Sequence, residues 1–187
     1  MIKKTLLLSI ILTLCAQLTY AQELRASLSH YSTDEGLSSN AISDIIQDKY
    51  GYTWISTWNG LCRFDGYNFY NYPTGNRSGI PFLHNRILNI TADPEGNIWM
   101  RMYDGRIFVL NRKRDMITNV FKGAKDPDEF KTEHAIKVSS SGYAYAIIKG
   151  KGIYSMKLLD NKIVTKPMLQ TKQTIHCIAI DKSENLW

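Results

Sequence analysis

Two aromatic residues each stand two positions before a glycine and could bind a ligand by stacking. These are Trp58, before Gly60, and Tyr103, before Gly105. Exposed aromatic faces beside a turn suit contact with the apolar face of a sugar ring. Arg101 could pair with a carboxylate or sulfate through its planar guanidinium. The candidate ligand-binding residues are therefore Trp58, Asn59, Arg101, Tyr103 and Asp104, and the alternative is that they are ordinary exposed hairpin residues.

The sequence offers no pattern typical of catalysis or metal binding. Its four histidines are far apart and lack the paired spacing of metal ligands. Neither a Gly-x-x-x-x-Gly-Lys phosphate loop nor a Gly-x-Ser-x-Gly nucleophile turn occurs. The formal charge of +6 is mild for 187 residues and argues against nucleic-acid binding. We expect no catalytic residue, no metal, no cofactor and no direct contact with nucleic acid.

The first 21 residues read as a secretory signal peptide. Lys3 and Lys4 precede an apolar run from Leu6 to Leu14, and the small residue Ala21 follows. A membrane span needs about 20 apolar residues, so this run is too short for one. The protein is therefore predicted to be exported.

Two cysteines remain after the predicted cleavage site. Cys62 and Cys177 each stand alone in an apolar, strand-like segment. We predict buried free thiols, because cysteine often packs as a small apolar residue. The alternative is a disulfide between them, which can form in an oxidising compartment.

A repeat runs through the rest of the chain. The pattern Asp-x-x-Gly-x-x-Trp occupies Asp48–Trp54 and Asp93–Trp99, and weaker copies occupy Ser139–Tyr145 and Asp181–Trp187. The aromatic positions are 54, 99, 145 and 187, so the steps are 45, 46 and 42 residues. A regular period of this length indicates a repeat architecture.

The first copy divides into four strand-like segments, at residues 42–48, 52–57, 61–64 and 68–72. Gly51 can take the positive φ of a turn, and Asn59-Gly60 and Asp65-Gly66 are strong hairpin signals. Four short antiparallel strands per repeat are typical of one blade of a β-propeller. The repeated tryptophans should fill the space between blades, and the repeated aspartates should cap their own turns. The basic run Asn111–Arg114 is predicted to be a solvated hairpin.

The predicted fold is all-β, a partial propeller of four-stranded antiparallel blades. Closure takes 4 to 8 blades, and this sequence supplies about three and a half, so the ring would be incomplete. Residues 22–36 would contain a strand, at Leu28–Tyr31, that completes the last blade of a full ring. The three blades are expected at residues 37–72, 73–121 and 122–166, and a truncated fourth begins at 167–187.

Strand order predicts which loops share a face of the propeller. In an up-down-up-down blade, the hairpin between the second and third strands lies beside the link to the next blade. That face would gather the five candidate residues with Lys149–Lys151 and the longer links Pro73–His84 and Lys122–His134. Long loops on a rigid frame often carry recognition, so we expect a ligand to bind here.

The repeats resemble the two-component regulator propeller repeat. The residues that carry the resemblance are Glu35–Asn40, Ile42–Asp48, Gly51–Thr57 and Asn59–Gly66. The resemblance weakens in the third repeat, where Ser139 and Tyr145 replace the aspartate and tryptophan. It implies the periplasmic sensor of a hybrid two-component system of Bacteroides-type bacteria, which detects an oligosaccharide. The kinase, receiver and DNA-binding parts of such a protein match no residue of this chain.

Three functions are open at this point. The resemblance favours the sensing portion of a hybrid sensor kinase at the periplasmic face of the inner membrane. Its partners would be an oligosaccharide, the remaining blades and the membrane-linked kinase of the parent chain, in a homodimer. This chain would then be no enzyme, although its parent would be a histidine kinase. The alternatives are an exported propeller enzyme acting on polysaccharide, as a lyase or glycosidase, and a structural or adhesive propeller.

Overall fold

The computed structural model describes residues 28–72 and 85–187. The chain divides into two compact units, Met1–His30 and Tyr31–Trp187. The predicted signal peptide and the link Pro73–His84 lie outside the described residues. No helix in the described part is long and apolar enough to cross a membrane.

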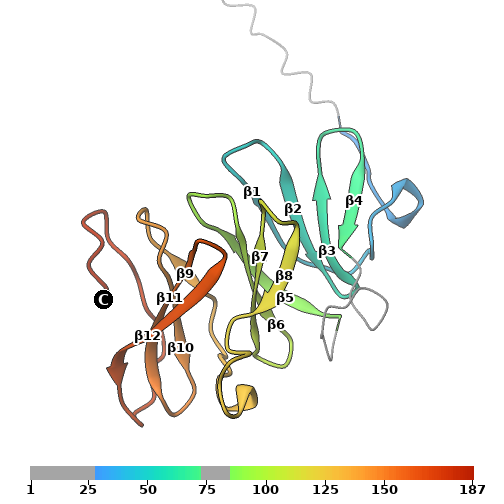
Figure 1. Ribbon diagram of the computed structural model, residues 1–187. Coiled ribbons are helices and arrows are strands. Elements are labelled where there is room, and N and C mark those ends of the chain that lie inside the picture. Colours follow the sequence, from blue (N-terminus) through green and yellow to red (C-terminus); the bar gives the residue numbers. More distant parts are fainter. Residues whose placement is uncertain (1–27, 73–84) are drawn as a thin grey trace, which may run out of the picture. The chain divides into compact units, whose positions relative to one another are not determined.

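The unit Tyr31–Trp187 contains three four-stranded antiparallel sheets that follow one another along the chain (Figure 1). Within each sheet the strands pair in chain order. The first sheet holds β1 (Ile42–Gln47), β2 (Thr53–Thr57), β3 (Gly60–Phe64) and β4 (Phe69–Tyr72). The second holds β5 (Ile87–Ala92), β6 (Ile98–Met102), β7 (Ile107–Asn111) and β8 (Met116–Asn119). The third holds β9 (Lys137–Val138), β10 (Ala144–Ile148), β11 (Gly152–Leu159) and β12 (Lys162–Gln170).

Each sheet is one propeller blade, which confirms the predicted all-β, partial-propeller fold. Two single-turn 3-10 helices, η1 (Thr33–Glu35) and η2 (Pro127–Glu129), are the helical elements of the described residues. The predicted hairpins form where expected, with Thr57 opposite Gly60 in the β2–β3 pair. Gly60 takes a φ of 104°, which an L side chain rarely adopts.

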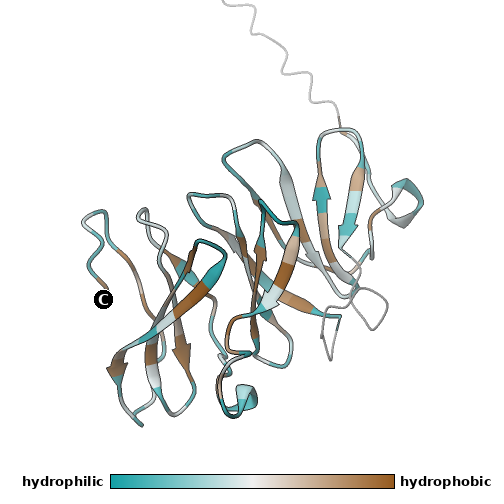
Figure 2. Cartoon of the chain, in the orientation of Figure 1, coloured by the Kyte–Doolittle hydropathy of each residue, from teal (hydrophilic) through white to brown (hydrophobic). Residues whose placement is uncertain are grey.

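The hydrophobic core lies between neighbouring blades. Trp54 of the first blade packs in one cluster with residues of the second, such as Ile87 and Met100. Trp99 of the second blade packs in the next cluster with residues of the third, such as Ala146. Apolar residues accordingly concentrate on the strands and polar residues at the turns (Figure 2). Burying such a side chain contributes roughly 1.5–3 kcal/mol, so the blades stabilise one another.

Each repeated aspartate binds both its own turn and the tryptophan of its blade. Asp48 accepts hydrogen bonds from the backbone N–H groups of Tyr50 and Tyr52, at 2.8 and 3.1 Å. Its other oxygen accepts the indole N–H of Trp54 at 2.9 Å. Asp93 holds Trp99 in the same way at 3.1 Å. The predicted capping role is confirmed, and the bond to the indole is a further role.

The turn glycine of the second blade packs against an aromatic residue of the first blade. Tyr50 lies so close to Gly96 that a Cβ there would come within 2.6 Å of the ring. Arg112 covers the same ring, with its guanidinium carbon 3.5 Å from the centroid. Arg112 is therefore half-buried on an aromatic ring, whereas Lys113 and Arg114 are exposed as predicted.

One expectation near the end of the described chain is wrong, and another stays a prediction. Residues 28–31 form no strand here, and the Tyr31 ring lies 5.0 Å from that of Phe64. The strand predicted at 28–31 concerns the last blade of a full ring, so it stays a prediction. The third blade does not end at residue 166, because β12 pairs with β11 as far as Gln170. Pro167 lies beside an irregularity in β12 itself, where Met168 has no partner in the β11 register.

The fourth repeat forms no sheet, and its tryptophan is not buried as those of the first two repeats are. Residues 171–187 contain one isolated bridge, between Ile180 and Leu186, and no strand. Trp187 is 76% exposed, and Cys177 is an exposed free thiol, so both were wrongly expected to be buried. Cys62 is free and buried as predicted, against Ser38 and Asn71.

Candidate functional site

Backbone hydrogen bonds join each predicted hairpin to the segment that follows its blade. The Gly60 N–H donates to the Asn85 carbonyl at 3.0 Å, and the Thr132 N–H donates to the Gly105 carbonyl at 2.8 Å. Thr171 likewise donates to Lys151 at 3.4 Å. We call this side of the unit the loop face: the β2–β3, β6–β7 and β10–β11 hairpins with the described links beside them.

Trp58 and Tyr103 lie on the loop face and meet around one arginine. Their side chains are 51% and 59% exposed. The guanidinium carbon of Arg86 lies 4.3 Å from the Trp58 ring centroid and 5.5 Å from that of Tyr103. These three residues form the aromatic–arginine cluster.

Asn59 extends the cluster along the seam between the first two blades. Its side-chain amide donates to the Ser38 carbonyl at 3.1 Å. Its carbonyl oxygen accepts from the Asn85 amide at 3.3 Å. The residue is exposed, so its polar groups stay within reach of solvent.

Arg101 and Asp104 are engaged by other residues of the protein. Arg101 donates to the Asn89 side chain at 3.0 Å and to the Glu133 carbonyl at 3.2 Å, and burial lowers its pKa. Asp104 lies 3.6 Å from the guanidinium of Arg106. These partners hold the loop face together, which leaves Arg101 less free to bind an anion than the sequence suggested.

Arg86 is the residue that sequence reasoning missed. The repeat could have indicated its position, because residues 41, 86 and 131 are 45 residues apart and so occupy similar places in successive repeats. Each of the three accepts a backbone hydrogen bond from the hairpin of its own blade, Arg86 from Tyr103 at 3.0 Å. In the first two blades this is the residue before the first strand, and in the second blade it is an arginine.

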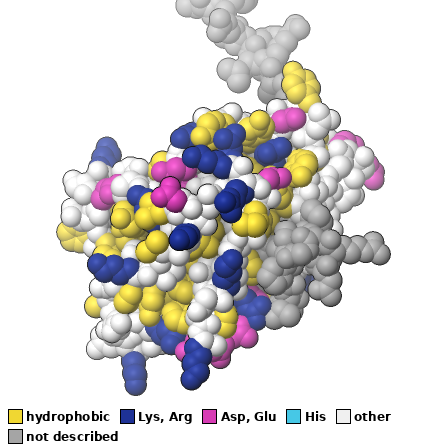
Figure 3. All heavy atoms as spheres, in the orientation of Figure 1, with side chains coloured by type: hydrophobic (Ala, Val, Ile, Leu, Met, Phe, Trp, Pro, Cys, Tyr) yellow, Lys and Arg dark blue, Asp and Glu magenta, His cyan; other side chains and the backbone are white. Residues whose placement is uncertain are grey.

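Three of the four acidic side chains in the link Lys122–His134 are paired with cations. Glu133 lies 2.7 Å from Lys149, and the hydrogen bond from that lysine lowers its pKa. Glu129 lies 2.8 Å from Lys151, and Asp128 pairs with Arg106. Several acidic groups on the visible side similarly lie beside Lys or Arg (Figure 3). A cavity of about 310 Å³ opens here, lined in part by Glu133, His134 and Lys149.

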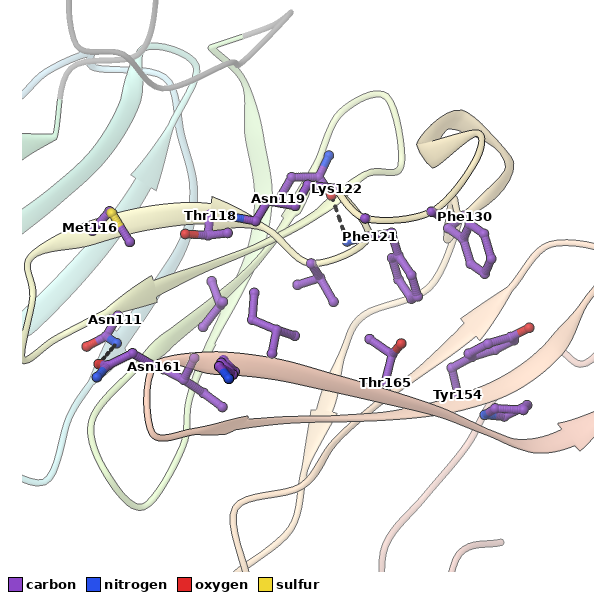
Figure 4. Close-up of a pocket in the computed structure, with 18 residues that line it drawn as sticks. Asn111, Met116, Thr118, Asn119, Phe121, Lys122, Phe130, Tyr154, Asn161 and Thr165 are labelled. Carbon is purple, nitrogen blue, oxygen red and sulfur yellow. Dashed lines mark hydrogen bonds between the residues drawn. The ribbon is translucent and has the colours of Figure 1, made fainter.

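A larger cavity, of about 590 Å³, lies between the outer strands of the second and third blades. Phe121 and Phe130 stack in it with ring centroids 4.4 Å apart, and Tyr154 meets Phe130 edge-on (Figure 4). Asn111 donates to Asn161 across the gap at 2.8 Å. The five residues predicted to bind ligand are not among its lining, so it is a separate feature of the fold.

Comparison with known proteins supports the fold and one repeat. The family model described as "Two component regulator propeller" matches residues 36–59. No curated protein matches the chain. Among solved structures, the extracellular domain of a one component system from B. thetaiotaomicron is 20% identical with a TM-score of 0.57. The match covers 86% of this chain and 24% of that one.

Two further structures share the fold. A streptogramin B lyase is 14% identical with a TM-score of 0.57, over 81% of this chain and 49% of that one. PorZ, a surface component of the type-IX secretion system of Porphyromonas gingivalis, is 18% identical with a TM-score of 0.52, over 78% and 23%. This chain therefore spans between about a quarter and a half of the length of these relatives. Residues 36–59 thus match the two component regulator propeller repeat, in a chain that folds into three four-stranded blades.

Proposed function

We propose that this chain is the ligand-sensing propeller portion of a hybrid two-component sensor kinase. The match over residues 36–59 supports a role in two-component regulation, because it names a repeat of such regulators. We propose that the domain is exported by way of residues 1–21 and works at the periplasmic face of the inner membrane. The kinase and the remaining blades belong to the parent protein, which acts as a homodimer.

The proposed ligand is an oligosaccharide bound on the loop face. The observation that supports this is the exposed pair Trp58 and Tyr103, brought together at the seam of two blades. Rigid, half-exposed aromatic rings provide large contact area at little entropic cost. Binding there would bridge two blades, and a ligand that favours one arrangement of the sensor shifts the population toward it.

An exported enzyme is the competing function. The fold does not discriminate between the two, since a streptogramin B lyase shares it at a TM-score of 0.57. In the described part of the chain, no group of three His, Cys, Asp or Glu side chains is placed to hold a metal. The repeat match favours sensing, and a test must therefore separate binding from turnover.

Calorimetry of the purified protein against a panel of oligosaccharides, with the sugars analysed afterwards, provides that test. We expect at least one sugar to bind and to be recovered intact. Trp58→Ala should weaken binding about tenfold, which equals about 1.4 kcal/mol. Tyr67→Ala is the matched control, because Tyr67 is 90% exposed in the β3–β4 turn, away from the hairpins of the loop face. Cleaved sugar would support the enzyme instead.

A further inference from the structure

Arg86 is held in a fixed place between the first two blades. Its carbonyl accepts the Tyr103 N–H at 3.0 Å, and the carbonyl of its neighbour Asn85 accepts the Gly60 N–H at 3.0 Å. Its side chain contacts the rings of Trp58 and Tyr103. Both the backbone and the guanidinium are thus positioned before any ligand arrives, which lowers the entropic cost of binding.

The charge of Arg86 has no carboxylate partner among the described residues, although the residue is exposed. The ion pairs of the loop face involve Arg106, Lys131, Lys149 and Lys151 instead. The adjoining link, residues 73–84, contains neither aspartate nor glutamate in its sequence. Arg86 therefore carries a positive charge that no carboxylate of the described residues neutralises.

A guanidinium beside two aromatic rings suits a ligand that carries an anionic group on a sugar ring. A guanidinium that stacks through its face keeps its N–H groups at the edge, where they match the two oxygens of a carboxylate or sulfate. Charge-assisted hydrogen bonds of this kind are about twice as strong as neutral ones. The exposed parts of Trp58 and Tyr103 provide apolar area beside that edge.

We propose that the aromatic–arginine cluster recognises an acidic oligosaccharide, whose carboxylate or sulfate binds the edge of Arg86 while its sugar ring lies against Trp58 and Tyr103. This inference rests on the proposed function, since it names the class of sugar that the loop face binds. It also assigns to Arg86 the anion-binding role that the sequence suggested for Arg101.

The experiment compares three probes of equal length by calorimetry: an oligogalacturonate, a sulfated galactose oligosaccharide and a neutral galactose oligosaccharide. We expect one or both acidic probes to bind at least tenfold more tightly than the neutral probe, and added salt to weaken that binding. The acidic probe that binds more tightly distinguishes the carboxylate from the sulfate. Arg86→Gln should abolish the preference, and Arg86→Lys should retain only part of it, because lysine lacks the planar fork.

Arg114→Gln is the matched control, since Arg114 is exposed in the β7–β8 turn and also carries one positive charge. It should leave the preference unchanged. A neutral probe that binds as tightly as the acidic ones, with no effect of Arg86→Gln, would overturn the inference and leave the proposed function standing. If none of the three probes, nor any sugar of the wider panel, binds, both fail together. Thermal unfolding of each variant shows that the fold is retained.

Discussion

At the scale of single residues, the repeated aspartate has the clearest physical role. Asp93 is buried and accepts hydrogen bonds from the N–H groups of Glu95 and Asn97 and from the Trp99 indole. One carboxylate thus satisfies a turn and also fixes the large side chain that fills the space between blades. A buried donor without an acceptor is costly, so this position tolerates few substitutes.

Replacing Asp93 with alanine should lower the free energy of unfolding by about 2–4 kcal/mol, because it strands several donors in a buried place. Guanidinium denaturation followed by circular dichroism measures the loss. Asp181→Ala is the matched control at the same repeat position, and its loss should be much smaller, since water can replace an exposed carboxylate. Equal losses at the two sites would contradict this account.

The exposed copy of the same turn predicts a response to acid. Hydrogen bonds from Asn185 and Trp187 lower the pKa of Asp181 from 3.8 to about 2. A lowered folded-state pKa means that the turn is stabilised above the unfolded value and loses this stabilisation as the pH falls through about 2. The indole N–H resonance of Trp187, followed by NMR, should report that midpoint. Asn185→Ala should raise that midpoint, because it removes the side-chain hydrogen bond from Asn185 and keeps the Trp187 indole as the reporter. A wild-type midpoint near 4 would refute the assignment.

At the scale of elements, the turn between the first two strands of a blade also serves the neighbouring blade. Tyr50 packs onto Gly96 beneath Arg112, and Glu95 approaches Gly142 to 3.0 Å from where a Cβ would stand. In the fourth repeat Glu184 replaces the glycine at a φ of 63°, and its carboxylate accepts the Ser141 N–H at 2.6 Å. The glycine of the motif is thus a contact between blades as well as a turn residue.

Gly51 and Gly96 separate these two roles. Both have positive φ, 86° and 83°, but a Cβ at Gly51 would meet nothing within 4 Å. Gly51→Ala should therefore cost only the backbone strain, about 1–2 kcal/mol. Gly96→Ala should cost about 0.5–1 kcal/mol more, because the half-exposed Tyr50 ring must leave Arg112. Denaturation measures the difference, which should shrink in a Tyr50→Ala background, where the Arg112 side chain alone still lies 3.1 Å from the added Cβ. An unchanged difference would exclude the contact with Tyr50.

At the scale of the whole molecule, each described blade makes its core with the next one. The clusters around Trp54 and Trp99 join the first blade to the second and the second to the third. In such arrays stability is approximately a sum of repeat and nearest-neighbour terms. Damage to one blade should therefore weaken its neighbour more than a blade further away.

Ile148→Ala tests this coupling, because Ile148 is buried in the cluster that joins the second and third blades. The cavity should cost about 2–5 kcal/mol in that region. Amide hydrogen exchange should show the greatest loss of protection in β9–β12, a smaller loss in β5–β8 and the least in β1–β4. A uniform loss over all three sheets would show that the unit unfolds as a single cooperative body.

The strands and turns of this protein could be predicted because their signals are local. The strand at Ile42–Gln47 and the hairpin at Asn59-Gly60 depend on neighbouring residues, and both appear in the structure. The period of the tryptophans is read directly along the sequence, and Trp54 and Trp99 occupy equivalent places in β2 and β6. The end of β12 could not be predicted, because pairing with β11 overrides the local signal of Pro167.

The sequence alone determined the blade, its period and the side of it that carries Trp58 and Tyr103, since these follow from strand order and turn chemistry. Only the tertiary structure decided what those residues touch. In the structure Arg86 contacts both rings, and Arg101 donates to the carbonyl of Glu133 in the neighbouring link. Trp187 is exposed, whereas Trp54 and Trp99 are buried. Such contacts join residues of different repeats, and their geometry depends on how whole blades pack against each other.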